Sequence, residues 1–167
     1  MTTREMSELS IHLEGVRYLT PDALKWINTR LILAQTPTEP LGVRSEDLLS
    51  SSQSRPAIHR SYTQTNDMFC LAAVLMESLI KNHCFANANK RTAAAAGYMF
   101  LLLNGYELTA PSQEFVDIMV GIATHEYDVE DLENWLAHWS RDFDASALNG
   151  PNEFFEMFGH LAAKPAC

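Results

Sequence analysis

The sequence predicts a mainly α-helical fold, and three observations support this prediction. Apolar residues recur three and four positions apart over most of the chain, which is the pattern of helices with one buried face. Residues that cap helices stand directly before several of these stretches. The one segment with extended character, residues 16–19, is too short to supply more than one strand. We therefore expect a compact helical domain of about six helices.

The first predicted helix begins at Pro21. Thr20 is placed to cap it, and proline is favoured at the first helical position because its missing N–H needs no partner there. Its apolar residues at helical spacing are Leu24, Ile27 and Leu31. Two prolines and a glycine then make residues 36–44 a predicted loop.

The segment after this loop has weaker helical signals. Ser45 is placed to cap a short helix that we expect to end near Leu49. Residues 50–65 are polar and contain Pro56, so the sequence predicts an exposed loop or flap there.

Two consecutive helices are expected to form the centre of the domain. The first opens at residues 66–67 and ends near Asn82. Its apolar face consists of Met68, Leu71, Ala72, Leu75 and Leu79. The second covers residues 88–103 and stops at Asn104-Gly105. Its alanine run, residues 93–96, permits close packing, which favours a central buried position for this helix.

Three further helices are expected toward the C-terminus. Ser112 is placed to cap one, whose inward residues are Phe115, Ile118, Met119 and Ile122. Asp128 and Asp131 are placed to cap the next, whose inward residues are Leu132, Trp135, Leu136 and Trp139. Residues 142–150 resemble a linker. A short terminal amphipathic helix is indicated by Phe154, Phe155, Phe158 and Leu161.

The composition is that of a cytoplasmic globular protein. A length of 167 residues suits one domain, and hydrophobic residues make up an ordinary 47%. We find neither the apolar run of ~18 residues that would span a membrane nor the apolar stretch of a signal peptide. The scattered, odd-numbered cysteines predict reduced thiols, and they are Cys70, Cys84 and Cys167.

The charge is negative overall and unevenly distributed. A net charge of -9 argues against general binding to nucleic acid. Residues 1–106 carry ten basic and nine acidic side chains, whereas residues 107–167 carry two and twelve. We interpret the acidic part as a solvated surface, and a basic partner as the alternative.

Residues 83–91 carry the chemistry that the sequence predicts. They read His-Cys-Phe-Ala-Asn-Ala-Asn-Lys-Arg and lead into the alanine-rich helix. The N-terminus of a helix binds anions, because its first N–H groups are unpaired and the helix dipole is positive there. His83 is a candidate general base beside this end, and Lys90 and Arg91 add two cations. Together these groups suit the transfer of a phosphate-containing group.

This stretch resembles the core motif of the Fic/Doc family, and its Asn-Lys-Arg ending resembles the Doc branch. Segments around the motif also match in order and spacing, and they are Leu19–Ile32, Gly42–Pro56, Ser78–His83 and Leu103–Tyr106. The resemblance implies one Fic/Doc-type domain over residues 16–141. Residues 1–15 then form a lead-in, and residues 142–167 a linker with a short amphipathic segment.

The resemblance also implies roles for the motif residues. His83 would take the proton from an attacking hydroxyl, and Asn87 stands at the position of the carboxylate that holds Mg²⁺. Because asparagine offers only a neutral oxygen, metal binding at Asn87 should be weaker. The catalytic residues implied are His83, Asn87 and Arg91. The expected ATP-binding residues are Ala86, Asn87, Ala88, Asn89, Lys90 and Arg91.

The activity implied is phosphoryl transfer from ATP to a hydroxyl of a protein, as in Doc-type toxins. Their target is elongation factor Tu, and a Phd-type antitoxin inhibits them by laying a helix into a groove. AMP-transferring relatives have glycine at the position of Lys90 and a second arginine at that of Ala94. AMP transfer is therefore the alternative enzyme activity. Asn87 keeps open a third interpretation, a catalytically weak module that binds nucleotide and antitoxin.

Overall fold

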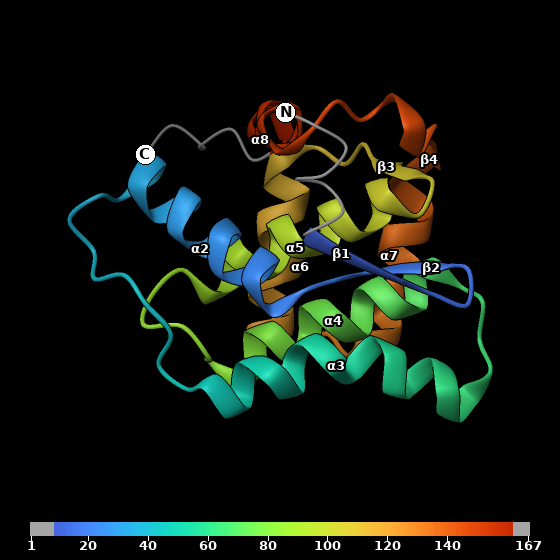
Figure 1. Ribbon diagram of the computed structural model, residues 1–167, viewed down its shortest axis with the longest axis horizontal. Coiled ribbons are helices and arrows are strands. Elements are labelled where there is room, and N and C mark those ends of the chain that lie inside the picture. Colours follow the sequence, from blue (N-terminus) through green and yellow to red (C-terminus); the bar gives the residue numbers. More distant parts are fainter. Residues whose placement is uncertain (1–8, 162–167) are drawn as a thin grey trace.

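Seven α-helices make up most of residues 9–161, the part of the chain that the computed structural model describes (Figure 1). They are α2 (Pro21–Gln35), α3 (Glu46–Thr63), α4 (Met68–Asn82), α5 (Asn89–Leu103), α6 (Ser112–Ala123), α7 (Val129–Trp139) and α8 (Pro151–Leu161). The strands form two antiparallel pairs, β1 (Ser10–Leu13) with β2 (Val16–Leu19) and β3 (Tyr106–Leu108) with β4 (Ser140–Asp142). The prediction of a mainly helical, compact domain is confirmed.

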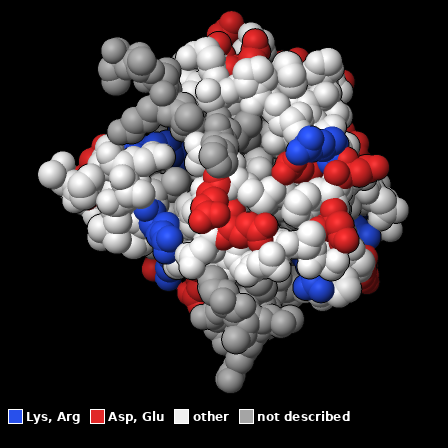
Figure 2. Space-filling view, turned by 90° about the horizontal axis from the view of Figure 1, so that it is seen from above, with Lys and Arg blue, Asp and Glu red and all other residues white. Residues whose placement is uncertain are grey.

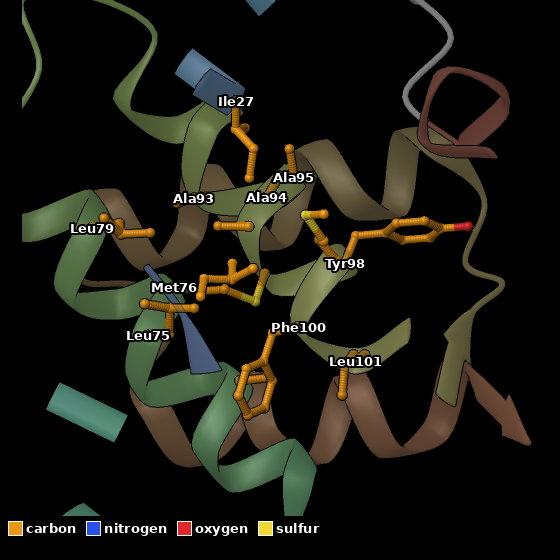
Figure 3. Close-up of a cluster of buried hydrophobic side chains, with 14 of the residues drawn as sticks. Ile27, Leu75, Met76, Leu79, Ala93, Ala94, Ala95, Tyr98, Phe100 and Leu101 are labelled. Carbon is orange, nitrogen blue, oxygen red and sulfur yellow. The ribbon is translucent and has the colours of Figure 1, made fainter. Parts of the chain in front are cut away.

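Helix α5 forms the centre of the core. Every residue from Thr92 to Leu103 is buried, and α2, α4, α6 and α8 pack around this helix. Figure 3 shows Leu75, Met76 and Leu79 of α4 facing the alanines of α5. The helices approach closely at Gly97, where an added Cβ would lie 2.2 Å from the Met76 sulfur. The predicted central position of this helix is therefore confirmed.

The region predicted as a loop after Leu49 is helical, so this prediction was wrong. Ser45 caps α3 as expected, because its hydroxyl accepts a hydrogen bond from Leu48 N at 3.2 Å, but the helix continues to Thr63. Pro56 lies inside α3 and is buried. Packing against α4 thus overrides the low helix propensity of the serines and the proline.

A polar cluster fixes α3 against α4 just before the end of α4. Asn82 Nδ2 donates a hydrogen bond to the fully buried Ser52 hydroxyl at 2.8 Å, and the Ser78 hydroxyl donates to it at 3.2 Å. Buried polar groups need such partners, so these contacts favour one register of α3 on α4.

The predicted extended segment at residues 16–19 is strand β2, but the hairpin that it forms with β1 was not predicted. In the β1–β2 pair, Ser10 lies opposite Leu19 and Leu13 lies opposite Val16. Glu14 and Gly15 form the turn between the two strands. Both turn residues have positive φ, 50° and 86°, as a tight two-residue hairpin turn requires. The hairpin precedes α2, and β2 packs on α3 and α5. The predicted domain boundaries at residues 16 and 141 stay predictions.

The C-terminal elements follow the predictions with small corrections. Asp128 and Asp131 form a reciprocal capping box at the start of α7. Helix α6 begins at Ser112 itself, preceded by Pro111, so Ser112 is not its cap. The predicted linker contains the end of β4 and a 3₁₀ turn, Ala145–Ala147.

The predicted terminal helix is present as α8, and it packs on the domain. Phe154 and Phe158 are buried, and both rings lie tilted against the ring of Tyr98 on α5. Phe155 contacts Trp26 of α2 edge to face. The side chain of Leu161 lies outside the part of the chain that is described. The aromatic residues therefore belong to the core of this end of the molecule.

Within residues 9–161, none of the helices has both the length and the apolar composition needed to cross a lipid bilayer. On the face shown in Figure 2, acidic side chains outnumber basic ones. This distribution agrees with the acidic charge of the C-terminal part of the sequence.

We predict that Gly97→Ala destabilises the protein although alanine is the better helix former. The new methyl group would collide with Met76, which is fully buried, and overpacking of this kind outweighs the gain in propensity by about 1–2 kcal/mol. Gly159→Ala in α8 is the control, because nothing lies within 4 Å of its added Cβ. Urea denaturation of both variants measures the difference, and equal stabilities would contradict the close α4–α5 contact.

Candidate active site

The motif residues form the loop between α4 and α5, and a second loop supports it. Phe85 is 2% exposed and forms an antiparallel bridge with Val43 of the α2–α3 loop. Ala86 N donates to Gly42 O at 3.0 Å, and Arg44 N donates to Cys84 O at 2.8 Å. The two loops therefore run side by side at one end of the molecule (Figure 1).

Residues in the left-handed conformation stand at both ends of the motif loop. His83 ends α4 with φ 46°, and Ala88 precedes α5 with φ 59°. This conformation costs a non-glycine residue about 1–3 kcal/mol and is concentrated at functional sites. It turns the chain sharply out of α4 and back into α5, so that the loop can follow the path that Phe85 anchors.

His83 is exposed at the edge of a cavity of about 340 Å³. Its ring makes no hydrogen bond to any residue in the described part of the chain. A histidine that is accessible and free of protein partners is available to accept a proton from a substrate hydroxyl.

The N-terminus of α5 opens into the same cavity. Among residues 9–161, no side chain caps this end, so its first backbone N–H groups are available to an anion. Lys90 and Arg91 add positive charge there. The cavity is lined by Glu39, Ile80, His83, Ala86, Asn87, Ala88, Asn89, Lys90, Arg91 and Ala123. The structure thus brings all of the predicted site residues together around one cavity.

Both polar atoms of the Asn89 side-chain amide hold the loop in place. Its Oδ1 accepts a hydrogen bond from Phe85 N, and its Nδ2 donates one to Phe85 O, both at 3.0 Å. The sequence analysis placed Asn89 among the ATP-binding residues. In the structure its side-chain amide holds the buried Phe85 in place, and the residue lines the cavity.

Asn28 is a second brace, which the sequence analysis missed. It is 1% exposed, and its Nδ2 donates to Asn87 O at 2.9 Å and to Thr92 Oγ1 at 3.0 Å. It therefore ties α2 to both the loop and the first turn of α5. A polar residue on the apolar stripe of α2, beside Ile27 and Leu31, was the available signal.

Asn87, the predicted metal position, is bound to the α2–α3 loop. Its Nδ2 donates a hydrogen bond to Pro40 O at 2.9 Å. Its Oδ1 accepts no hydrogen bond from the described residues and is available as a ligand. The amide of Asn87 is therefore fixed in place, and one neutral oxygen is left for a metal.

Arg91 is held by three polar side chains that the sequence analysis did not identify. Its Nη1 donates to Gln35 Oε1 and Thr36 Oγ1, both at 3.1 Å. Its Nη2 forms an ion pair with Glu39 Oε2 at 3.0 Å. No sequence signal marked Glu39, which lies in a loop between two prolines and more than fifty positions before Arg91.

Cys84 is not a reactive thiol. Its side chain is completely buried, and burial raises its pKa. A thiolate is therefore disfavoured in the folded protein.

An apolar cleft of about 360 Å³ adjoins the anion site. The two cavities share Lys90 and Arg91. The remaining lining of the cleft comes from the end of α2 and from α5, α6 and α8, and includes Ala94, Phe115, Val116, Met119, Val120 and Phe158. A ligand in the cleft would therefore reach the start of α5.

The residues around the cavity fit Mg²⁺ only together with a nucleotide. No group of three or more His, Cys, Asp or Glu side chains placed to hold a metal ion occurs in residues 9–161. Mg²⁺ usually takes one or two protein ligands and completes its shell with phosphates and water. Asn87 and Glu39 are the side chains at the cavity with oxygen atoms suited to this role.

The geometry defines a class of protein, a helical domain in which a helix N-terminus without a side-chain cap from the described residues lines the same cavity as an exposed histidine. Comparison with known proteins identifies the family. The sequence model of the Fic/DOC family matches residues 18–101. The chain therefore belongs to this family.

Two curated relatives are of the Doc type. "Toxin Doc" of Mycolicibacterium smegmatis is 34% identical over 113 residues, which cover 66% of this chain and 84% of the relative. "Protein kinase doc" of Escherichia phage P1 is 33% identical over 93 residues, which cover 56% of this chain and 70% of the relative. The family match over residues 18–101 includes the whole motif, residues 83–91.

We predict that Asn28→Ala lowers the free energy of unfolding by about 1–3 kcal/mol, because Asn87 O and Thr92 Oγ1 lose a buried donor. The control is Asn134→Ala on α7, where the side chain is exposed. Chemical denaturation of both variants is the measurement. An Asn28→Ala protein as stable as the control would show that this brace is dispensable.

Proposed function

We propose that this protein is a phosphotransferase that moves the γ-phosphoryl group of ATP to a hydroxyl of a protein. The observation that carries the proposal is the free ring of His83 at the same cavity as the uncapped N-terminus of α5. His83 would act on the attacking hydroxyl, and the N-terminus of α5 would act on the transferred phosphoryl group. The name of the phage P1 relative, a protein kinase, supports the same reaction class.

In the proposed step His83 takes the proton of the target hydroxyl. The hydroxyl oxygen then bonds to the γ-phosphorus while the bond from that phosphorus to the β–γ bridging oxygen breaks, and ADP leaves. The α5 N–H groups and Arg91 stabilise the charge on the phosphoryl oxygens. Bound Mg²⁺ would neutralise the phosphates of the nucleotide.

Lys90 and Ala94 favour phosphoryl over AMP transfer. Lys90 stands where AMP-transferring members of the family have glycine, and its side chain takes the room that inner phosphates would need. Ala94 replaces their second arginine, and it lines the apolar cleft. The anion site therefore has one arginine, Arg91, which suits a terminal phosphate.

A second candidate function is binding without efficient catalysis. The observation that favours it is Asn87, whose amide is engaged by Pro40 O and which brings no charge to a metal. Such a protein would keep nucleotide and antitoxin binding. The intact mass of a candidate target after incubation with ATP separates the possibilities, because it shows a gain of one phosphate, one AMP or nothing.

We further propose the partners of this protein by analogy with its relatives. One relative is named a toxin, which supports a toxin role for this chain. The target that we propose is elongation factor Tu in the cytoplasm, and its modification would arrest translation. A Phd-type antitoxin helix would place its apolar face in the cleft beside α6 and α8. An occupant there would also cover Lys90 and Arg91, which line both cavities.

We predict that His83→Ala abolishes transfer while the fold is kept, because a general base contributes ~10²–10⁴-fold to a rate. The control is His138→Ala on α7, which lies outside the cavity. Phosphate incorporation into purified elongation factor Tu is the measurement, with growth arrest on expression as a second readout. Equal transfer by the two variants would remove His83 from the mechanism.

We predict that Arg91→Ala weakens ATP binding about tenfold or more, since hydrogen bonds to charged groups contribute roughly 1.5–3 kcal/mol. Arg60→Ala removes an equal charge from the surface, where Arg60 contacts Leu13 O and Asn66. Isothermal titration calorimetry with ATP compares the two variants. Matching affinities would mean that nucleotide phosphates do not bind at the start of α5.

A further inference from the structure

We propose that Glu39 supplies the metal-binding carboxylate that Asn87 lacks, and that it exchanges its contact with Arg91 for phosphate-bound Mg²⁺ when ATP enters. This inference rests on the proposed use of ATP. It assigns a role to a residue of the α2–α3 loop, outside the sequence motif.

Glu39 is the one carboxylate among the described residues that line the motif cavity. Its side chain is 37% exposed, so it is accessible from the cavity and from solvent. Its Oε2 accepts hydrogen bonds from Arg91 Nη2 and Thr36 Oγ1, both at 3.0 Å. The other oxygen, Oε1, has no partner in the described chain. Glu39 therefore has ligand capacity at the site even in its present position.

The ion pair with Arg91 places Glu39 beside the expected phosphate. A phosphate on Arg91 would bring a second negative charge next to the carboxylate, and like charges that share one guanidinium repel each other. A divalent cation between the phosphate and Glu39 converts this repulsion into attraction. Without such a cation, Glu39 competes with the nucleotide for Arg91.

Asn87 and Glu39 are joined through the backbone between them. Asn87 Nδ2 donates to Pro40 O at 2.9 Å, and Pro40 directly follows Glu39. The free Oδ1 of Asn87 and the carboxylate of Glu39 thus come from two loops that are hydrogen-bonded to each other. One amide oxygen, one carboxylate and phosphate oxygens form a ligand set that Mg²⁺ accepts.

The alternative is that Glu39 only locks Arg91 in the ligand-free protein. Both roles predict that Glu39→Gln changes ATP affinity, but they differ in its dependence on Mg²⁺. If Glu39 is only a lock, it weakens ATP binding equally with and without the metal. If it is a metal ligand, its charge weakens the binding of ATP alone and strengthens the binding of ATP with Mg²⁺.

The test is calorimetric titration of ATP, in Mg²⁺ and in EDTA, into the full chain and its variants. For the unaltered protein we expect Mg²⁺ to strengthen ATP binding about tenfold more than it does for Glu39→Gln. In EDTA, Glu39→Gln should bind ATP more tightly than the unaltered protein. Glu46→Gln is the matched control, because it removes the same charge at the start of α3, where Glu46 pairs with Lys25.

A rescue variant makes the test specific. Asn87→Asp combined with Glu39→Gln returns a carboxylate to the family's usual position and should restore the response to Mg²⁺. Glu39→Asp, which keeps the charge on a shorter side chain, should retain part of that response. Circular dichroism of each variant shows whether its fold is kept.

Each other outcome counts against the inference. An unchanged Mg²⁺ response in Glu39→Gln would overturn it, and so would a gain in affinity of equal size with and without Mg²⁺, which identifies a lock. Failure of the double variant to recover the response would also refute a ligand role. If the unaltered protein binds no ATP under either condition, the proposed function fails and the inference fails with it.

Discussion

The close contact between α4 and α5 is the constraint on which the site depends. Gly97 leaves the space that Met76 fills, so the two helices can lie against each other along the alanine face of α5. Helix α4 ends at Asn82, directly before His83, and α5 begins at Asn89. The packing of the helices therefore sets how far the candidate base lies from the candidate anion site. Catalytic groups on rigid elements of this kind keep their geometry without help from the ligand.

The loop between these helices would be poorly determined without support from distant parts of the chain. Phe85 is anchored by Val43 and by the side chain of Asn89, and Asn28 holds the carbonyl of Asn87. These contacts satisfy backbone groups of the loop itself, which lies outside both helices and has no helical hydrogen bonds. The site is thus assembled from two loops and one helix end, and the α2–α3 loop is a part of it rather than a connection.

Much of the fold could be predicted from the sequence because the helices α2, α4 and α7 have apolar residues at helical spacing and clear N-terminal caps. Helix α5 could be predicted from its alanine run and from the stop at Asn104-Gly105. Helix α3 could not, since its serines and Pro56 indicate a loop, and only contact with α4 favours the helix. In the sequence, the hairpin turn is indicated by two residues alone, Glu14 and Gly15, which is a weak signal. Residues 83–91 could be recognised as one site because they are consecutive in the chain. The partners of Arg91, in contrast, depend on how α2 and its loop pack, and no local pattern encodes that contact.

The burial of Cys84 has a practical consequence for the study of motion at this site. Its thiol lies directly beside His83 in the chain, is fully buried, and has a raised pKa, so alkylating reagents have access to it only when the motif loop opens. With Cys70 and Cys167 replaced, the rate of maleimide labelling becomes a measure of how often the loop leaves its anchored position. The protein therefore contains its own reporter of the local opening equilibrium, placed one residue from the proposed base.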